Sequence, residues 1–163
     1  MSRSRSAAER AERLRSPLLI ALWILLAFEA ASGLLLFTAF LVAGRRPGEA
    51  LHVVAGVPLA VVYAVYQWRH WRRVSPFRGR PDHVLGLVAA SVTALTLATG
   101  LWLAVPWWIA RVASPRAGPV AYPVALSAVH NIGSMLVMAF VGAHLVAVLS
   151  RGAARERGGR TPG

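Results

Sequence analysis

The most informative apolar stretch spans residues 129–145, Val-His-Asn-Ile-Gly-Ser-Met-Leu-Val-Met-Ala-Phe-Val-Gly-Ala-His-Leu, and it carries His130 and His144. An α-helix turns about 100° and rises about 1.5 Å per residue, so fourteen residues return the second imidazole to nearly the same face, about 21 Å further along. Ionisable side chains in such an apolar segment are rare and usually functional. The stretch therefore predicts a membrane helix with one histidine near each end of a single face.

The composition of the whole chain is also that of a membrane protein. Its mean hydropathy is +0.55, and 56% of its 163 residues are hydrophobic, whereas 15% are charged. A helix needs about 20 apolar residues to cross about 30 Å of hydrocarbon. Four stretches are long enough: Leu18–Ala43, Leu51–Trp68, Val84–Val105 and Val124–Leu149. We therefore expect an all-α fold, an integral membrane four-helix bundle.

The basic residues predict how this bundle is oriented. All 18 are arginines, and only four lie in the first and third loops: Arg45, Arg46, Arg111 and Arg116. The others lie in the two tails and the second loop, so the positive-inside rule places both termini in the cytoplasm. This sidedness explains the net charge of +12. We expect contact with membrane lipid and no nucleic-acid partner.

Three parts of the chain follow from this pattern. Residues 1–16 are expected to form a basic cytoplasmic segment, residues 17–150 the four-helix membrane domain, and residues 151–163 a basic cytoplasmic tail that is disordered because it has little apolar content. The first apolar stretch, at about 26 residues, is too long for the apolar region of a signal peptide, so it is expected to be a retained helix.

The chain has no cysteine. Disulfides, thiolate-held iron–sulfur clusters and covalently attached c-type haem are therefore excluded. Any redox cofactor would be held without a covalent bond.

A second pair of histidines, His52 and His70, shares a face of the second predicted helix, because eighteen residues make five full turns. In the expected topology, His52 and His130 lie at the outer level and His70 and His144 at the inner level. Neutral imidazole is a strong ligand for haem iron, which takes one axial ligand on each side of the ring. We therefore predict two haem b groups, one at each level. The alternatives are a single haem, or none, with histidines solvated near the interfaces.

Glycines repeat the histidine interval. Gly86 and Gly100 in the third predicted helix are fourteen residues apart, and the first predicted helix has Gly33. Glycine lets a macrocycle approach the backbone of a helix, so these three residues are candidate cofactor-binding positions. The alternative is ordinary packing of small residues between membrane helices.

Two ionisable residues leave alternatives open. His83 begins the third predicted helix at the level of His70 and is the alternative inner ligand. Glu29 lies near the middle of the first predicted helix, where a charge is costly, so it is expected to be neutral or hydrogen-bonded. Three roles are open for Glu29. It is part of a proton path linked to quinone chemistry, it pairs with a buried polar group near a haem, or it is a neutral acid hydrogen-bonded to a backbone carbonyl or to Ser32.

These features together resemble the four-helix b-type cytochrome subunits of respiratory nickel–iron hydrogenases and formate dehydrogenases, and their small relatives among bacterial membrane cytochromes. The resemblance covers residues 17–150 and rests on the pair His130 and His144, on His52 followed by Gly56, and on the segment Ser-Gly-Leu-Leu-Leu-Phe at residues 32–37. It implies multi-pass insertion in a bacterial-type inner (plasma) membrane.

The resemblance also implies roles for the histidines. The fourth helix would give His130 to an outer haem and His144 to an inner haem, and His52 would be the outer partner. The formate dehydrogenase type takes its inner partner from the start of the first helix, where Arg15-Ser16-Pro17-Leu18 has no histidine. His70 or His83 would replace it here. Two haems between the second and fourth helices would be similar to quinol-oxidising cytochrome b, whose Pro-Glu-Trp-Tyr motif is absent.

The function expected from this resemblance is electron transfer across the membrane between a redox partner subunit and a quinone pool. The chain would be an electron-transfer subunit of an oxidoreductase complex rather than an enzyme alone, with no catalytic residues of its own. Two alternatives remain. One is a standalone transmembrane reductase of an external acceptor, and the other is a haem-free membrane scaffold or transporter whose histidines bind protons or metal.

Overall fold

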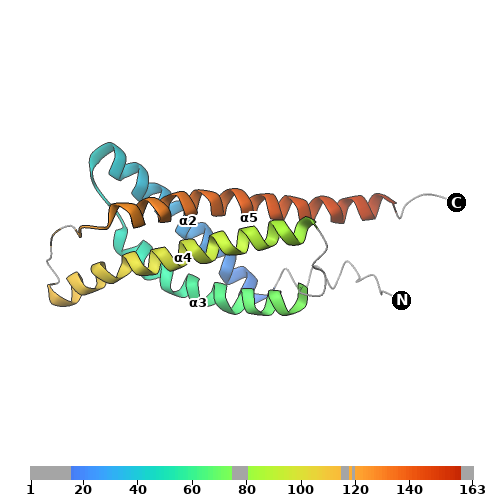
Figure 1. Cartoon of the computed structure of the whole chain (residues 1–163), viewed down its shortest axis with the longest axis horizontal. Coiled ribbons are helices and arrows are strands. Elements are labelled where there is room, and N and C mark those ends of the chain that lie inside the picture. The colour runs from blue at the N-terminus through green and yellow to red at the C-terminus, as the bar shows by residue number, and fades with distance from the viewer. Residues whose placement is uncertain (1–15, 75–80, 115–117, 119, 159–163) are drawn as a thin grey trace. The chain divides into compact units, whose positions relative to one another are not determined.

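The structure is a computed structural model, and it describes residues 16–74, 81–114, 118 and 120–158. The described elements are four α-helices (Figure 1): α2 (Pro17–Ala43), α3 (Glu49–Val74), α4 (Pro81–Ala113) and α5 (Val124–Gly158). Each contains a segment that is long and apolar enough to cross a membrane. Within the described residues, the prediction of an all-helical chain with four membrane-length helices is confirmed.

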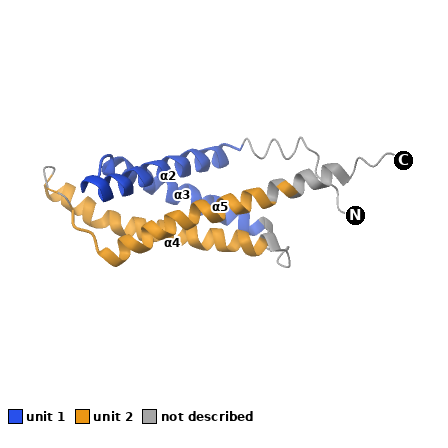
Figure 2. Cartoon of the chain, turned by 90° about the horizontal axis from the view of Figure 1, so that it is seen from above, with its two compact units in different colours: residues 1–72 blue, residues 73–163 orange. Residues whose placement is uncertain are grey.

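The chain divides into two compact units, Met1–Arg72 and Arg73–Gly163 (Figure 2). The first unit contains α2 and nearly all of α3, and the second contains α4 and α5.

In the first unit, local signals set where α2 begins and ends. The backbone N–H of Leu19 donates to the hydroxyl oxygen of the N-cap Ser16 at 3.3 Å. At the other end, Gly44 adopts a left-handed conformation with φ 62° and donates to the carbonyl of Phe40 at 2.9 Å. Gly48, with φ 77°, follows in the short turn before α3. Glycine adopts positive φ without a steric cost, so these two residues permit the tight connection between the two helices.

In the second unit, α4 and α5 lie side by side (Figures 1 and 2). Gly133 of α5 faces Thr96 of α4, and a Cβ built on this glycine would lie 2.5 Å from Thr96 Oγ1. Two neighbouring buried threonines satisfy their hydroxyls on their own helix: Thr93 donates to the Ala89 carbonyl at 2.7 Å and Thr99 to the Leu95 carbonyl at 2.9 Å. Small and internally bonded side chains thus allow the two helices to approach closely.

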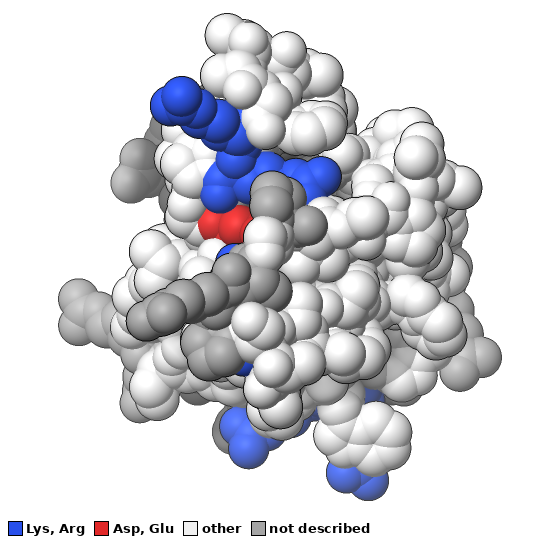
Figure 3. Space-filling view, turned by 90° about the vertical axis from the view of Figure 1, so that its left-hand side faces the viewer, with Lys and Arg blue, Asp and Glu red and all other residues white. Residues whose placement is uncertain are grey.

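The surface of the helices is largely apolar. Each helix exposes large aliphatic side chains, such as Ile24 at 63%, Val61 at 60%, Ile109 at 63% and Ile132 at 59%. Most of the face in Figure 3 consists of uncharged residues, and the charged side chains form a few small clusters. An apolar surface of this extent is unusual for a protein in water and is compatible with contact with membrane lipid.

Three helices extend beyond the stretches predicted from hydropathy. Helix α3 continues through the arginine-rich residues 69–73 to Val74, and α4 continues through the mostly apolar residues 106–112 to Ala113. Once a helix has begun, each further residue adds a backbone hydrogen bond at little cost. Helix α5 continues to Gly158, so the prediction of disorder from residue 151 does not hold for residues 151–158. Ala153, Ala154 and Arg155 are strong helix formers, which explains the extension. The predictions for residues 1–15 and 159–163 lie outside the described residues.

Candidate functional site

The ring of His130 on α5 lies directly against Gly100 on α4. A Cβ built on Gly100 would be 2.8 Å from Cε1 of the imidazole and 3.2 Å from Nδ1. Real Cβ atoms essentially never come closer than 3.0 Å, so any side chain at position 100 would displace the ring or the helix. Gly100 is therefore required by the position of His130, even though its backbone conformation is an ordinary helical one.

The same relationship recurs further along these two helices. A Cβ built on Gly86 would be 3.0 Å from Cε1 of His144 and 3.4 Å from Nδ1. A step of fourteen residues forward along α5, from His130 to His144, corresponds to a step of fourteen residues back along α4, from Gly100 to Gly86. Antiparallel helices in constant register produce this correspondence. The second unit thus holds two imidazoles, each against a glycine of α4.

The first unit has a third histidine–glycine contact. A Cβ built on Gly33 of α2 would be 3.2 Å from Cε1 of His52 on α3. One turn away on each helix, a Cβ built on Gly56 would be 4.0 Å from Oε2 of Glu29, which is ordinary van der Waals contact. On α2, Glu29 and Gly33 therefore lie opposite Gly56 and His52 of α3, in reverse order.

Hydrogen bonds fix which nitrogen of His130 carries the hydrogen. Its Nδ1 lies 3.0 Å from the backbone carbonyl oxygen of Thr96 and 3.4 Å from the hydroxyl of Thr99. A carbonyl only accepts, and the Thr99 hydroxyl already donates to carbonyls of its own helix at 2.9 and 3.0 Å. Nδ1 is therefore the donor, and in the neutral imidazole the lone pair is then on Nε2. This tautomer is the one that binds metal through Nε2.

His52 has a similar environment, with a carboxylate in place of the backbone carbonyl. Its Nδ1 lies 2.8 Å from Glu29 Oε2 and 2.9 Å from Ser32 Oγ. The Ser32 hydroxyl donates to the backbone carbonyl of Glu29 at 3.3 Å, which leaves its oxygen to accept from Nδ1. Both side chains of this contact are largely buried, at 20% exposure for His52 and 11% for Glu29. The carboxylate and hydroxyl thus hold the imidazole from the side of Nδ1.

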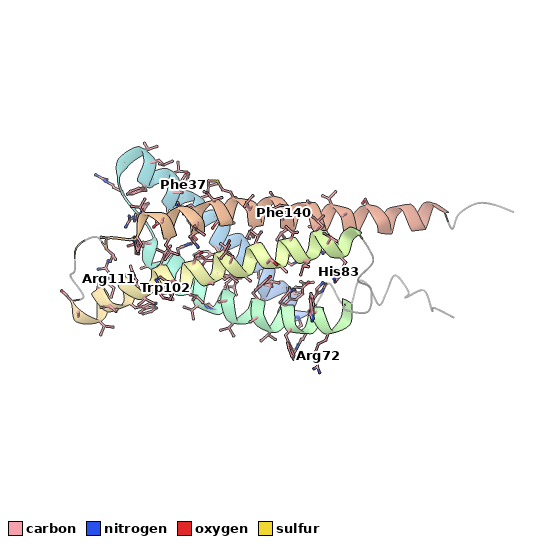
Figure 4. The ribbon with its side chains drawn as sticks, in the orientation of Figure 1. Phe37, Arg72, His83, Trp102, Arg111 and Phe140 are labelled. Atoms are coloured by element: carbon pink, nitrogen blue, oxygen red, sulfur yellow. The ribbon has the colours of Figure 1, made fainter. Side chains whose placement is uncertain are left out.

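The two candidates for the inner ligand lie in different units. His70 is half-buried on α3 and stacks on Tyr66, with ring centroids 5.5 Å apart and an angle of 19° between planes. His83 is half-buried near the start of α4, whereas Trp102 and Arg111 lie towards its other end (Figure 4). The choice between His70 and His83 stays a prediction for mutagenesis.

Sequence reasoning did not identify Thr96 or Thr99. It named Ser32 as a possible partner for Glu29 and as the first residue of the segment 32–37, but not as a partner for His52. A local signal for two of them exists in the sequence. Ser32-Gly33 and Thr99-Gly100 are both hydroxyl–glycine pairs, and each presents its glycine to an imidazole and its hydroxyl to Nδ1 of the same ring. The contact of His130 with Thr96 uses the backbone carbonyl of Thr96, so no pattern of side chains in the sequence predicts it.

Comparisons of the chain with protein-family models, with curated proteins and with solved structures gave no match.

Proposed function

We propose that this chain is an integral membrane b-type cytochrome that holds two haems and carries electrons across the membrane. The observation that carries the proposal is the hydrogen bond from His130 Nδ1 to the Thr96 carbonyl, made by a ring that rests on Gly100. It supports a ligand role because it makes Nδ1 the donor, so that Nε2 is the nitrogen with the lone pair in the neutral imidazole, and because it fixes the plane of the ring. Histidines serving only as surface residues have no need of such support.

The donor set fits haem. Haem binds to protein imidazoles, and His52, His70 or His83, His130 and His144 are the residues that would supply them. At Gly33, Gly86 and Gly100 an imidazole ring lies against the helix backbone, and a side chain at any of these positions would collide with the ring or crowd it. Because the chain has no cysteine, it would hold haem without a thioether link. When bound, haem supplies one-electron redox chemistry, while the histidines orient it and tune its potential.

The proposal assigns His52 and His130 to an outer haem and His144, with His70 or His83, to an inner haem. This pairing follows from the levels of the residues along the predicted membrane helices. Fourteen residues of α5 separate His130 from His144 by about 21 Å along the helix axis. This spacing supports one haem site near each membrane surface, and haems held at both sites would supply a path for electrons across the membrane.

Insertion in a bacterial-type inner membrane, with both termini in the cytoplasm, belongs to the same proposal. The exposed aliphatic surface of all four helices supports lipid contact, and the arginine distribution supports the orientation. The loops at residues 44–48 and 114–123 are too short to form a substrate-binding domain. We therefore assign electron donation and acceptance to a redox partner subunit and a quinone pool.

Proteoliposomes that enclose ferricyanide test this function. Dithionite is added outside, and valinomycin with K⁺ compensates the charge that moves. Haem-loaded wild-type protein is expected to speed the loss of ferricyanide absorbance, whereas His144→Ala is not, because the chain of cofactors is interrupted. Equal rates with wild-type protein and with protein-free vesicles would overturn the proposal. Purification of the chain from its native membrane then distinguishes the two redox alternatives. A subunit is expected to copurify with partner proteins, whereas a standalone reductase is expected to purify alone.

A further inference from the structure

The contact between Glu29 and His52 lies in a unit whose helices are otherwise largely apolar. Both side chains are polar, and Glu29 lies about a dozen residues into a helix of membrane length, at 11% exposure. Burying a carboxylate costs several kcal/mol unless a partner offsets the loss of water. Within the described residues, its Oε1 has no hydrogen-bond partner, so the contact of Oε2 with His52 at 2.8 Å is what offsets its burial.

The geometry around the pair is specific. Glu29, Ser32 and Gly33 occupy positions i, i+3 and i+4 of α2, so they share one face, and all three meet the His52 ring. The edge of the ring lies against Gly33, and Glu29 Oε2 and Ser32 Oγ lie 2.8 and 2.9 Å from Nδ1. One helix face therefore fixes both the position of the imidazole and its tautomer.

His130 provides an internal comparison. Its Nδ1 donates to an uncharged backbone carbonyl at 3.0 Å, whereas the partner of His52 Nδ1 is a carboxylate at 2.8 Å. A hydrogen bond to a charged acceptor is about twice as strong as one between neutral groups. It draws the Nδ1 hydrogen away from the ring and makes Nε2 a more basic ligand.

We infer that Glu29 is the positioning residue of His52, and that it lowers the midpoint potential of the haem that His52 would ligate by making this imidazole a more electron-donating ligand. The inference rests on the proposed function. A more basic ligand stabilises ferric iron over ferrous iron, so the outer haem is expected to hold its electron less tightly than it would with a neutral partner for His52.

The test is a potentiometric titration of full-length Glu29→Gln in detergent, with haem content and the electron paramagnetic resonance spectrum of the ferric protein measured on the same samples. Glutamine keeps an acceptor oxygen and the side-chain size but removes the charge. We expect two haems per chain, a higher midpoint potential for one of them, no change for the other, and a shifted largest g value in one low-spin signal.

Glu49→Gln is the matched control. Glu49 lies in the same unit, three residues before His52, and pairs with Arg46 at 3.6 Å. Its variant removes the same charge and is expected to leave both g values and both midpoints close to those of the wild type. An equal shift in Glu49→Gln and Glu29→Gln would overturn the inference, because a general charge effect would then explain both.

A second variant, Glu29→Asp, keeps the test decisive if Glu29→Gln fails to bind one haem. If Glu29→Gln loses one haem, Glu29→Asp is expected to restore it, because it keeps the carboxylate; recovery supports the positioning role, and continued loss opposes it. Two haems with unchanged midpoints and g values in Glu29→Gln would overturn the inference while leaving the cytochrome proposal intact. A wild-type chain that binds no haem would overturn both.

Discussion

The imidazole of His130 rests on Gly100 so closely that a Cβ at position 100 would lie 2.8 Å from Cε1. The corresponding distances are 3.0 Å for Gly86 with His144 and 3.2 Å for Gly33 with His52. Below 3.0 Å the neighbour has to move, while up to 3.4 Å it has to yield by only a few tenths of an ångström. A side chain would therefore be hindered most at Gly100, less at Gly86 and least at Gly33.

This series predicts the effect of a single added methyl group. Gly100→Ala is expected to reduce haem content most, Gly86→Ala less and Gly33→Ala least, because the displacement of the imidazole decreases in that order. Overpacking of this kind costs about 1–3 kcal/mol. Haem per chain, measured by the pyridine haemochrome, checks the order.

Gly142→Ala is the control for this series. Gly142 lies on α5, the helix that carries His130 and His144, and a Cβ built on it would meet no atom of the described residues within 4 Å. Alanine also favours the helix by about 1 kcal/mol over glycine. Wild-type haem content is expected in this variant. Similar haem losses in Gly142→Ala and Gly100→Ala would show that glycine contacts with the imidazoles are not the cause.

A separate prediction concerns the packing of α4 on α5 without a histidine. Gly133→Ala places a methyl group 2.5 Å from Thr96 Oγ1 and is expected to destabilise the fold by about 1–3 kcal/mol. The double variant Thr96→Ala with Gly133→Ala removes the colliding side chain but keeps the carbonyl that accepts from His130. It is expected to recover most of the lost stability, as measured by thermal unfolding in detergent. Additive losses in the double variant would contradict this contact.

Histidine variants test the pairing of ligands. His52→Ala and His130→Ala are expected to remove the same haem and to leave the other with its wild-type midpoint potential, because each residue would supply one of the two imidazoles that hold the outer haem. His144→Ala is expected to remove the other haem. Redox-difference spectra of the three variants check this, and removal of different haems by His52→Ala and His130→Ala would refute the pairing.

The inner level needs its own comparison. We expect His70→Ala to lose the same haem as His144→Ala and His83→Ala to keep both haems, since His70 shares a helix face with His52. The reverse result would assign the inner ligand to His83, near the start of α4.

Hydropathy was sufficient to predict four helices, because about 20 apolar residues specify a membrane-length helix whatever its neighbours. It did not locate the helix ends, since Arg and Ala residues continue α5 to Gly158 outside the apolar segment. The equal intervals of the histidines and glycines were visible in the sequence. Which glycine faces which histidine was not, because the interval leaves the register between two helices undetermined.

The contact between Glu29 and His52 shows the same limit. Sequence reasoning placed Glu29 at mid-depth and named a buried polar partner as one option. The partner itself depends on the register of α2 against α3, which the turn containing Gly44 and Gly48 sets. Backbone acceptors such as the Thr96 carbonyl are available at every position, so only the fold selects the one that meets His130.

The central claim, that the chain binds two b-type haems through its histidines, is tested most directly by haem stoichiometry. Full-length protein is expressed with sufficient haem, purified in detergent, and analysed by the dithionite-reduced minus oxidised spectrum and the pyridine haemochrome. The account predicts two b-type haems per chain. A single haem per chain would contradict the prediction of a second haem site. A folded but colourless protein would contradict the cytochrome assignment and favour a haem-free scaffold or transporter.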